Sequence, residues 1–504
     1  MLVPFSPPPG LNSDDTTFAA EGRWADGNNV RFYNGKPQVI DGIAVRFTNS
    51  GLPFPRRILP FNRSGALTVA YAGDDGLGGS PKLYVGSGLS SPSDRTPGGL
   101  GTHYSWSLAP WGSTLLACPE GGTLYEQTGT NTAVAITEAP DNITFMLVTP
   151  ERQVLALGCN EEASGTFNSL CIRGSDIEDY SSAGSWTTSS SNNAFEHILD
   201  SGGAIVSGVY VGPYLVVFTT ADMYLGTFVG DPGQAFRFEP IERNCGGIAG
   251  PNARVAFNGA LYWMGQDRRI RRWIPGGRPE ILPCPIFNDN HSGIAPTDLR
   301  YVVASANSRY NEVRFDYRGG GATSFPTGSL GNGQYVALCL SDGAWYRGAG
   351  GATAIGDYGE IAGNSAASGS TILGSRSSGE IVIRDTIDEF FWGGGAAAAQ
   401  LAPYITSADQ YLDKGQRRMM IRSFIPDFED QSADVFLTLF VRDRPMSSAT
   451  TKGPHTITTA TTKKDFRASG KIVSVKIAGN ASQAGLLRCR LGKPLFDMVP
   501  LGER

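Results

Sequence analysis

A pattern of two apolar strands joined by a glycine-containing turn recurs between about residues 56 and 388, and it constrains the fold more than any other feature. Residues 214–218 and 223–225 form one such copy. The copies follow one another at intervals of about 40 residues, with one interval of about 60. This is the spacing of the blades of a β-propeller, each of which is a four-stranded sheet. The pattern predicts an all-β fold with a propeller of six to eight blades, and we prefer seven.

Composition agrees with many short strands. The 504 residues include 65 Gly and 31 Pro, and only 18% are charged. Such a chain favours tight turns over helices. The longer interval contains residues 175–193, a Ser- and Asn-rich segment that we expect to be a surface loop. The alternative that the hairpins form one or two β-sandwiches stays open.

The two end segments differ from the middle. A Pro-rich arm is followed by a hairpin whose Asn34-Gly35 pair is typical of a type I′ turn. Near the other end, residues 435–441 and 471–477 alternate as strands with an apolar face. Because Phe436 and Phe440 add to the other face of the first of these strands, we expect it to be covered on both sides. Because a lone hairpin is unstable, we expect it to pack on these strands.

We therefore predict four parts. Residues 1–50 are an N-terminal arm and hairpin that join a platform, 51–392 are the propeller, 393–402 are a Gly/Ala linker, and 403–504 are the C-terminal β-sandwich of the platform. The candidate packing residues of this platform are Trp24, Val30, Phe32, Val473, Val475, Ile477 and Leu491.

Charge divides the chain in the same way. From residue 403 onward there are 16 Lys or Arg against 10 Asp or Glu, a net of +6, whereas the preceding part has a net of −11. This favours either a basic patch for nucleic acid or a basic module that pairs with an acidic neighbour. The candidate subunit-interface residues are Arg417, Arg418, Arg422, Arg467, Lys471, Arg490 and Lys493.

Catalytic and metal-binding patterns do not emerge from the sequence. The four His residues are far apart, the seven Cys residues include no C-x-x-C pair, and no phosphate-binding loop motif is found. Residues 341–345 contain part of an Asp-box turn, which we interpret as structural rather than as a sialidase marker. Arg268, Arg269, Arg271 and Arg272 form a basic run, for which a solvated strand or subunit contact is preferred to a nucleic-acid site. We predict a non-enzyme without cofactor or metal. Residues 1–10 lack the features of a signal peptide, and no apolar run is long enough to span a membrane.

Stretches at both ends and in the middle of the sequence resemble a known family. At the ends they are GRWADGNNVRFYNGKP at residues 22–37, DFRASGK at 465–471 and RLGKP at 490–494, and in the middle they are DMYL at 222–225, NCGGIAG at 244–250 and ALYWM at 260–264. Together they resemble the tail nozzle, or packaged-DNA stabilisation, proteins of short-tailed phages. The resemblance extends over nearly the whole chain, and its motifs are structural rather than catalytic.

The resemblance implies a structural virion protein, made in the host cytoplasm and placed in the phage tail. Six copies are expected to form a ring below the head-to-tail adaptor protein, in contact with tail fibre or tailspike and needle or tip proteins. Packaged double-stranded DNA would be retained by this tube and pass through it without sequence-specific contacts. The alternative function is a tail-associated propeller that binds or cleaves host surface glycans.

Overall fold

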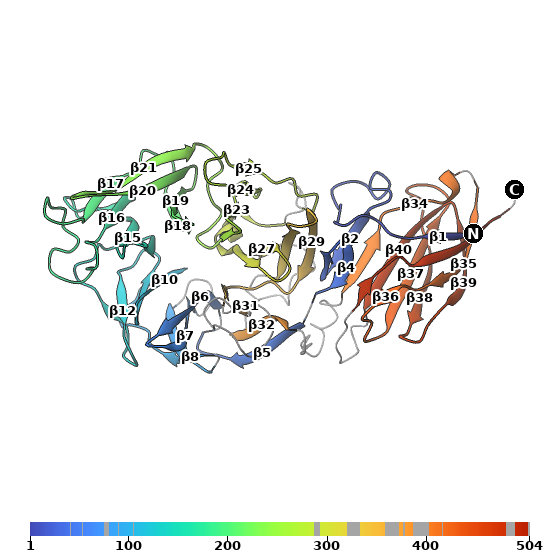
Figure 1. The fold of residues 1–504 in the computed structure, drawn as a ribbon, viewed down its shortest axis with the longest axis horizontal. Coiled ribbons are helices and arrows are strands. Elements are labelled where there is room, and N and C mark those ends of the chain that lie inside the picture. Colours follow the sequence, from blue (N-terminus) through green and yellow to red (C-terminus); the bar gives the residue numbers. More distant parts are fainter. Residues whose placement is uncertain are drawn as a thin grey trace.

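The computed structural model describes residues 1–504 except 41, 53, 75–79, 89, 104, 287–292, 320–332, 358–371, 376–378, 387–402, 416, 480–488 and 502–504. Nearly all regular structure in the described residues is β-strand, with two short 3-10 helices, η1 Pro296–Tyr301 and η2 Leu412–Gly415. The molecule has two lobes that lie side by side, a ring of sheets and a smaller platform (Figure 1). The predicted linker and the run of alanines within it lie outside the described residues.

The ring is a seven-bladed β-propeller. Its four-stranded antiparallel sheets are, in order, β6 Phe54–Arg63, β7 Ala66–Asp74, β8 Lys82–Ser87 and β9 Ser93–Asp94; β10 Trp106–Trp111, β11 Thr114–Pro119, β12 Tyr125–Gln127 and β13 Val134–Ala135; β14 Phe145–Val148, β15 Val154–Asn160, β16 Phe167–Gly174 and β17 Phe195–Ile198; β18 Ile205–Val211, β19 Tyr214–Thr219, β20 Met223–Asp231 and β21 Gln234–Glu242; β22 Arg254–Phe257, β23 Ala260–Met264, β24 Ile270–Trp273 and β25 Glu280–Ile281; β26 Val303–Asn307, β27 Glu312–Tyr317, β28 Gln334–Cys339 and β29 Ala344–Ala349; and β30 Ile355–Asp357, β31 Ile372–Ser375, β32 Glu380–Thr386 and β5 Gly42–Thr48.

The first strands of successive sheets contact one another in a closed circuit, β6, β10, β14, β18, β22, β26, β30 and back to β6. These strands therefore surround the propeller axis, and Figure 1 looks onto the ring that they form. Apolar side chains fill the space between neighbouring blades. Phe145 and Leu157 of the third blade, for example, share a buried cluster with Leu215 and Phe236 of the fourth. The predicted propeller, and the preferred count of seven blades, are confirmed.

The seventh blade closes the ring with a strand from far away in the sequence. Strand β5 pairs antiparallel with β32, with Ala44 opposite Ile383 and Phe47 opposite Ile381. We had expected residues up to 50 to belong to the platform, so the boundary lies earlier than predicted. The physical reason is that β30, β31 and β32 supply only three strands of the seventh blade, and β5 adds the fourth strand that each of the other six blades also has.

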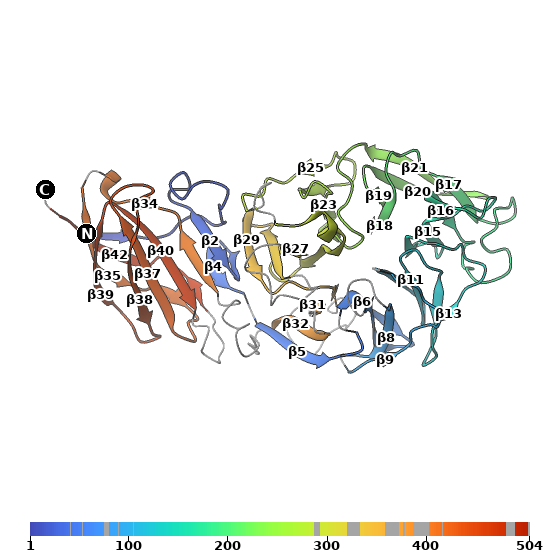
Figure 2. The same ribbon diagram turned by 180° about the vertical axis from the view of Figure 1, so that it is seen from behind.

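The platform is built from strands of both end segments. One sheet has the order β1 Leu2–Pro4, β42 Leu495–Pro500, β35 Met419–Ile425 and β39 Lys464–Gly470; a second has β2 Trp24–Asn28, β33 Tyr404–Ser407, β40 Ile472–Gly479, β37 Val435–Arg442 and β38 Thr450–Ile457, with β34 Gln410–Tyr411 beside β40; a third has β3 Val30–Tyr33, β4 Lys36–Val39, β41 Arg490–Leu491 and β36 Phe428–Glu429. Figure 2 shows the same strands from behind, with β1 and β42 at the end remote from the propeller. The expected β-sandwich platform is confirmed.

Two local predictions about the platform have different outcomes. Asn34 and Gly35 both adopt positive φ, 51° and 74°, between Tyr33 and Lys36, as a type I′ turn requires. Strand β37 was expected to be covered on both faces. Val435 and Leu439 on one face are buried, whereas Phe436 and Phe440 on the other face are partly exposed.

The predicted surface loop at 175–193 is anchored more firmly than its composition suggests. Tyr180 and Trp186 are both buried in the cluster between the second and third blades. The Trp186 indole N–H donates to the Tyr180 carbonyl at 2.9 Å. Two aromatic side chains thus fix a loop that is otherwise polar.

The packing of the platform leads to a prediction for Phe496. Its ring lies 5.7 Å from that of Phe5 and 5.1 Å from that of Phe424, measured between centroids. We expect Phe496→Ala to lower the free energy of unfolding of the platform by about 3–5 kcal/mol, because it leaves a cavity among these rings. Urea unfolding with peptide-level hydrogen exchange should show protection lost in β1, β35 and β42 before the propeller.

Phe167→Ala provides the matched control, because Phe167 is 52% exposed on the third blade. This change should move the free energy of unfolding by less than about 0.5 kcal/mol. Equal losses for the two variants would contradict the packing described here.

Candidate functional site

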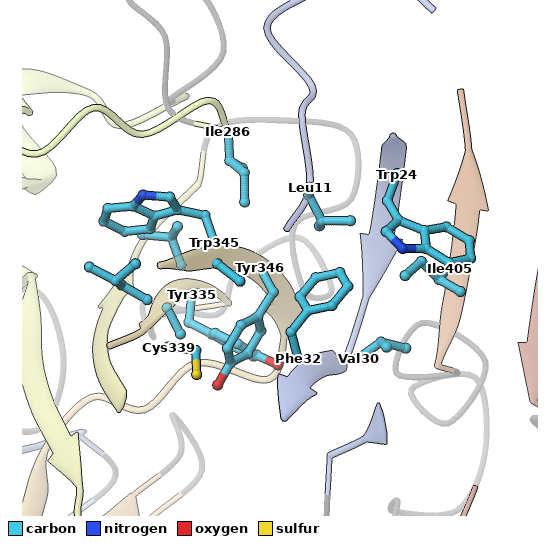
Figure 3. Packing of buried hydrophobic residues seen from close by; sticks show 14 of the residues in the cluster. Leu11, Trp24, Val30, Phe32, Ile286, Tyr335, Cys339, Trp345, Tyr346 and Ile405 are labelled. Carbon is cyan, nitrogen blue, oxygen red and sulfur yellow. The ribbon is translucent and has the colours of Figure 1, made fainter. Parts of the chain in front are cut away.

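The candidate site is the junction between the two lobes, where buried charged, polar and aromatic side chains from both lobes meet. Strands β2 and β3 of the platform contact β29, the last strand of the sixth blade. The Leu11 N–H donates to the Trp345 carbonyl at 2.8 Å, and the Asn29 N–H donates to the Arg347 carbonyl at 3.1 Å. Figure 3 shows Phe32 between the blade residues Tyr335 and Tyr346 and the platform residues around it. The junction therefore continues the hydrophobic core from one lobe into the other.

A buried ion pair crosses this junction. Arg31 Nη2 lies 3.2 Å from Glu312 Oε1, and the two side chains are only 2% and 4% exposed. The Tyr346 hydroxyl donates to the other carboxylate oxygen of Glu312, and the Arg31 guanidinium lies 3.6 Å from the centroid of the Tyr310 ring. Burial of two charges is costly unless several groups satisfy them. Here the partners come from both lobes, so the pair is satisfied only when the lobes are docked.

Tyrosines act as donors within this network. Burial, followed by the charge of Glu312, raises the pKa of Tyr346 well above its ordinary value, so its hydroxyl stays protonated. The Tyr335 hydroxyl donates to Asn29 Oδ1 at 2.8 Å. On the Tyr335 ring lies the guanidinium of Arg314, 3.4 Å from the centroid, and Arg314 pairs with Asp316 at 2.8 Å. Hairpin residues 29 and 31 thus each insert into a blade-six network.

The rim of the junction is held by a third set of contacts. Arg347 Nη2 lies 2.6 Å from Asp26 Oδ1, and the Tyr404 hydroxyl donates to Asp26 Oδ2 at 3.1 Å. Burial and the neighbouring Asp26 carboxylate raise the pKa of Tyr404 to about 12. Asp26 therefore joins blade six to both an N-terminal and a C-terminal strand of the platform.

The partial Asp-box turn also belongs to the junction. Asp342 Oδ2 accepts a hydrogen bond of 2.9 Å from the N–H of Gly35, in the hairpin turn. Trp345 is buried in the same apolar cluster as Phe32. These contacts explain the turn at 341–345 as a structural feature, which agrees with the interpretation made from the sequence.

The candidate packing residues gather in one place. Trp24, Val30, Phe32, Val473, Val475, Ile477 and Leu491 are all buried and belong to a single apolar cluster. Sheet pairing and this cluster connect residues from the two ends of the sequence.

The candidate interface residues are more dispersed, and Arg418, Arg422 and Arg490 form ion pairs with other described residues. Arg418 pairs with Asp443 at 3.1 Å, and Arg422 pairs with Asp497 at 2.9 Å. Arg490 binds Glu429 at 3.3 Å and also donates to Gln38 Oε1 at 3.1 Å. Arg490 thus joins the hairpin to the C-terminal segment instead of facing outward.

The other four interface candidates are not brought together as a cluster. Arg417, Arg467 and Lys493 are exposed, whereas Lys471 is half-buried between β39 and β40. Lys471 contributes its backbone, since its N–H donates to the Arg442 carbonyl at 3.1 Å.

The basic run of the fifth blade is largely neutralised. Arg271 is buried and binds both carboxylate oxygens of Asp267, at 2.7 and 2.6 Å. Arg272 donates from Nε to Glu280 at 2.5 Å. A strand with ion-paired arginines explains this run without a nucleic-acid ligand.

Sequence reasoning missed Arg31, Asn29 and Glu312, the polar residues of the junction. Period-2 alternation puts Arg31 on the face opposite Val30 and Phe32, and in the structure residues of blade six cover it. The sequence signal for a buried charge was an arginine between two apolar residues, Val30 and Phe32. Its partner, Glu312, has no local signature.

Groups of three or more His, Cys, Asp or Glu arranged to hold a metal ion are not found among the described residues. In the same part of the chain, no helix has the length and apolar character needed to cross a membrane.

Comparison with known proteins gives similarity of structure only. Neither a family model nor a curated protein matches the chain. The chain is similar to BamB from Moraxella catarrhalis, at 11% identity over 71% of this chain and 99% of that one with a TM-score of 0.35. Likewise it is similar to BBS1N crystallised in complex with ARL6DN, at 13% identity over 69% and 97% with a TM-score of 0.42. A third similar structure is YCF48 bound to D1 peptide, at 12% identity over 72% and 98% with a TM-score of 0.36.

The buried pair supports a double-mutant prediction. Arg31→Met should lower the free energy of unfolding by about 3–5 kcal/mol, because Glu312 is left charged in an apolar junction. Adding Glu312→Gln should restore a large part of that loss, since the unpaired charge is removed. Urea titration of the four members of the cycle measures both effects.

Lys36→Met is the control for this cycle. Lys36 pairs with Glu429 at 2.6 Å, but both side chains are more than 40% exposed, so the change should cost less than about 1 kcal/mol. If Arg31→Met cost no more than Lys36→Met, the ion pair would not hold the lobes together.

Proposed function

We propose that this protein is a structural component of a short-tailed phage tail, and that several copies, expected to be six, form a ring or tube that retains and conducts the packaged genome. The observation that carries the proposal is the junction, at which strands from both ends of the sequence are fixed to one blade by buried contacts. A closed ring needs subunits whose two contact surfaces keep a constant relation to each other. Docked lobes with a shared core meet that requirement.

The distribution of charge supports the same proposal. Each subunit in a ring presents two different surfaces that meet between neighbours. The part of the chain from residue 403 has a net charge of +6, and the part before it has a net charge of −11. Oppositely charged surfaces steer association and fix its register. The basic side chains available for this contact include the exposed Arg467 and Lys493, which form no ion pair within the described part of the chain.

The acidic majority also suits passage of DNA. A negative wall repels phosphates, so a duplex can move past it without being held. The sequence resemblance to tail nozzle proteins supports the same role, a tube through which the genome passes. Adaptor, fibre or tailspike, and needle or tip proteins are the partners that the proposal requires.

Native mass spectrometry of the purified chain at low salt tests the proposal. Six subunits are expected in the assembled species. The double variant Arg467→Glu with Lys493→Glu should shift the population toward monomer, because it reverses two basic side chains on the platform. Arg237→Glu is the matched control, since Arg237 is 73% exposed on the fourth blade.

A monomer at every concentration, together with release of oligosaccharides from host surface polysaccharide, would contradict the proposal. That result would favour the alternative of a glycan-cleaving propeller. If the double variant assembled like the unmodified chain, Arg467 and Lys493 would not contribute to the contact between subunits.

A further inference from the structure

Two arginines meet at the centre of the propeller without a carboxylate beside them. Arg57 lies on β6 of the first blade, and Arg254 begins β22 of the fifth blade. Both strands belong to the innermost circuit of the ring. Neither guanidinium forms an ion pair with any carboxylate in the part of the chain that the structure describes.

The contacts of Arg254 are with the fourth and third blades. Its Nη2 donates to the Gly208 carbonyl of the fourth blade at 2.5 Å, and its guanidinium lies 5.1 Å from the centroid of the Phe145 ring of the third blade. The residue is 9% exposed, and its buried Nε has no hydrogen-bond partner. An unpartnered donor on a buried cation is costly, so it points to a missing acceptor.

Arg57 reaches toward the same region from the opposite side. Its Nη1 donates to Asn252 Oδ1 at 3.2 Å, two residues before Arg254. Both ends of the Asn252 amide are engaged, because its Nδ2 also donates to the Arg56 carbonyl at 3.2 Å. Arg57 itself is partly exposed, so solvent reaches this end of the pair.

The neighbouring Arg56, in contrast, is neutralised by a buried carboxylate. Its Nε lies 2.9 Å from Asp74 Oδ2, and both side chains are buried. Arg57 and Arg254 have no equivalent of Asp74. Burial lowers the pKa of Arg57, and burial together with the charge of Arg57 lowers the pKa of Arg254 to about 9. Arg254 is therefore still mainly protonated at neutral pH, and the positive charge of Arg57 repels it.

We propose that Arg57 and Arg254 form a binding site for a small oxyanion, a phosphate or carboxylate group, among the inner strands of the propeller. The groups left over at this place are N–H donors of two guanidiniums, and a guanidinium has five donors and no acceptor. Such a set selects a ligand that only accepts hydrogen bonds and carries negative charge. The site is formed within one chain and does not depend on ring assembly.

Titration with inorganic phosphate and, separately, with acetate tests the site and distinguishes the two sources of the oxyanion. Calorimetry and thermal unfolding of the full chain are followed against sodium chloride at matched ionic strength. A bound oxyanion should raise Tm beyond the chloride effect, because a ligand that binds only the folded state stabilises it. Stabilisation by phosphate alone assigns a phosphate group, and stabilisation by acetate assigns a carboxylate.

Three variants make the test specific. Arg254→Met and Arg57→Met should each weaken binding at least tenfold, whereas Arg237→Met on the outer surface should bind like the unmodified chain. In chloride alone, Arg57→Met should be at least as stable as the unmodified chain, because it relieves repulsion between two cations.

No stabilisation by either oxyanion beyond chloride would overturn the proposal. It would equally be overturned if both Arg57→Met and Arg254→Met kept full binding. Because Arg57 is partly exposed, its variant keeps the test valid even where Arg254→Met fails to fold.

Discussion

The docking of the two lobes depends on one constraint, that the charges of Arg31 and Glu312 are satisfied only across the junction. Water has been removed from both groups, and their partners are divided between the hairpin and the sixth blade. Separation of the lobes would expose an apolar core and leave Glu312 and its tyrosine partner without the cation. Apolar packing contributes a non-directional attraction that grows with the buried apolar area. The polar network, in contrast, is directional, and it selects one relative placement of the lobes.

The N-terminal segment connects every part of the architecture. Its first strands complete two platform sheets, its hairpin enters the junction, and β5 then closes the seventh blade. Completion of the last blade by a strand that precedes the first blade in sequence joins the two ends of the ring. The same segment therefore couples closure of the propeller to assembly of the platform. The charged end of Met1, 2.8 Å from the Met498 carbonyl, lies within this arrangement as well.

Much of the fold follows from local patterns in the sequence. The strand and turn period gives the propeller, and the Asn34-Gly35 pair gives the hairpin turn, because both depend on residues close in sequence. The role of β5 could not be found in this way, since its partner is at the far end of the propeller. The burial of Arg31 could not be found for a similar reason, because alternation shows two faces of a strand but not what covers them. Arg57 and Arg254 likewise lie in different blades, so they come together only when the ring is closed.

The central claim is that the propeller and the platform form one body, fixed by the junction. Single-molecule FRET between dyes at Ile274→Cys on the fifth blade and Met446→Cys on the platform measures this directly, because both side chains are exposed. The partly exposed Cys245 and Cys284 are first replaced by Ser. The account predicts one narrow distribution of transfer efficiency, which broadens in the Arg31→Met variant. A broad or two-peaked distribution in the otherwise unmodified chain would contradict it.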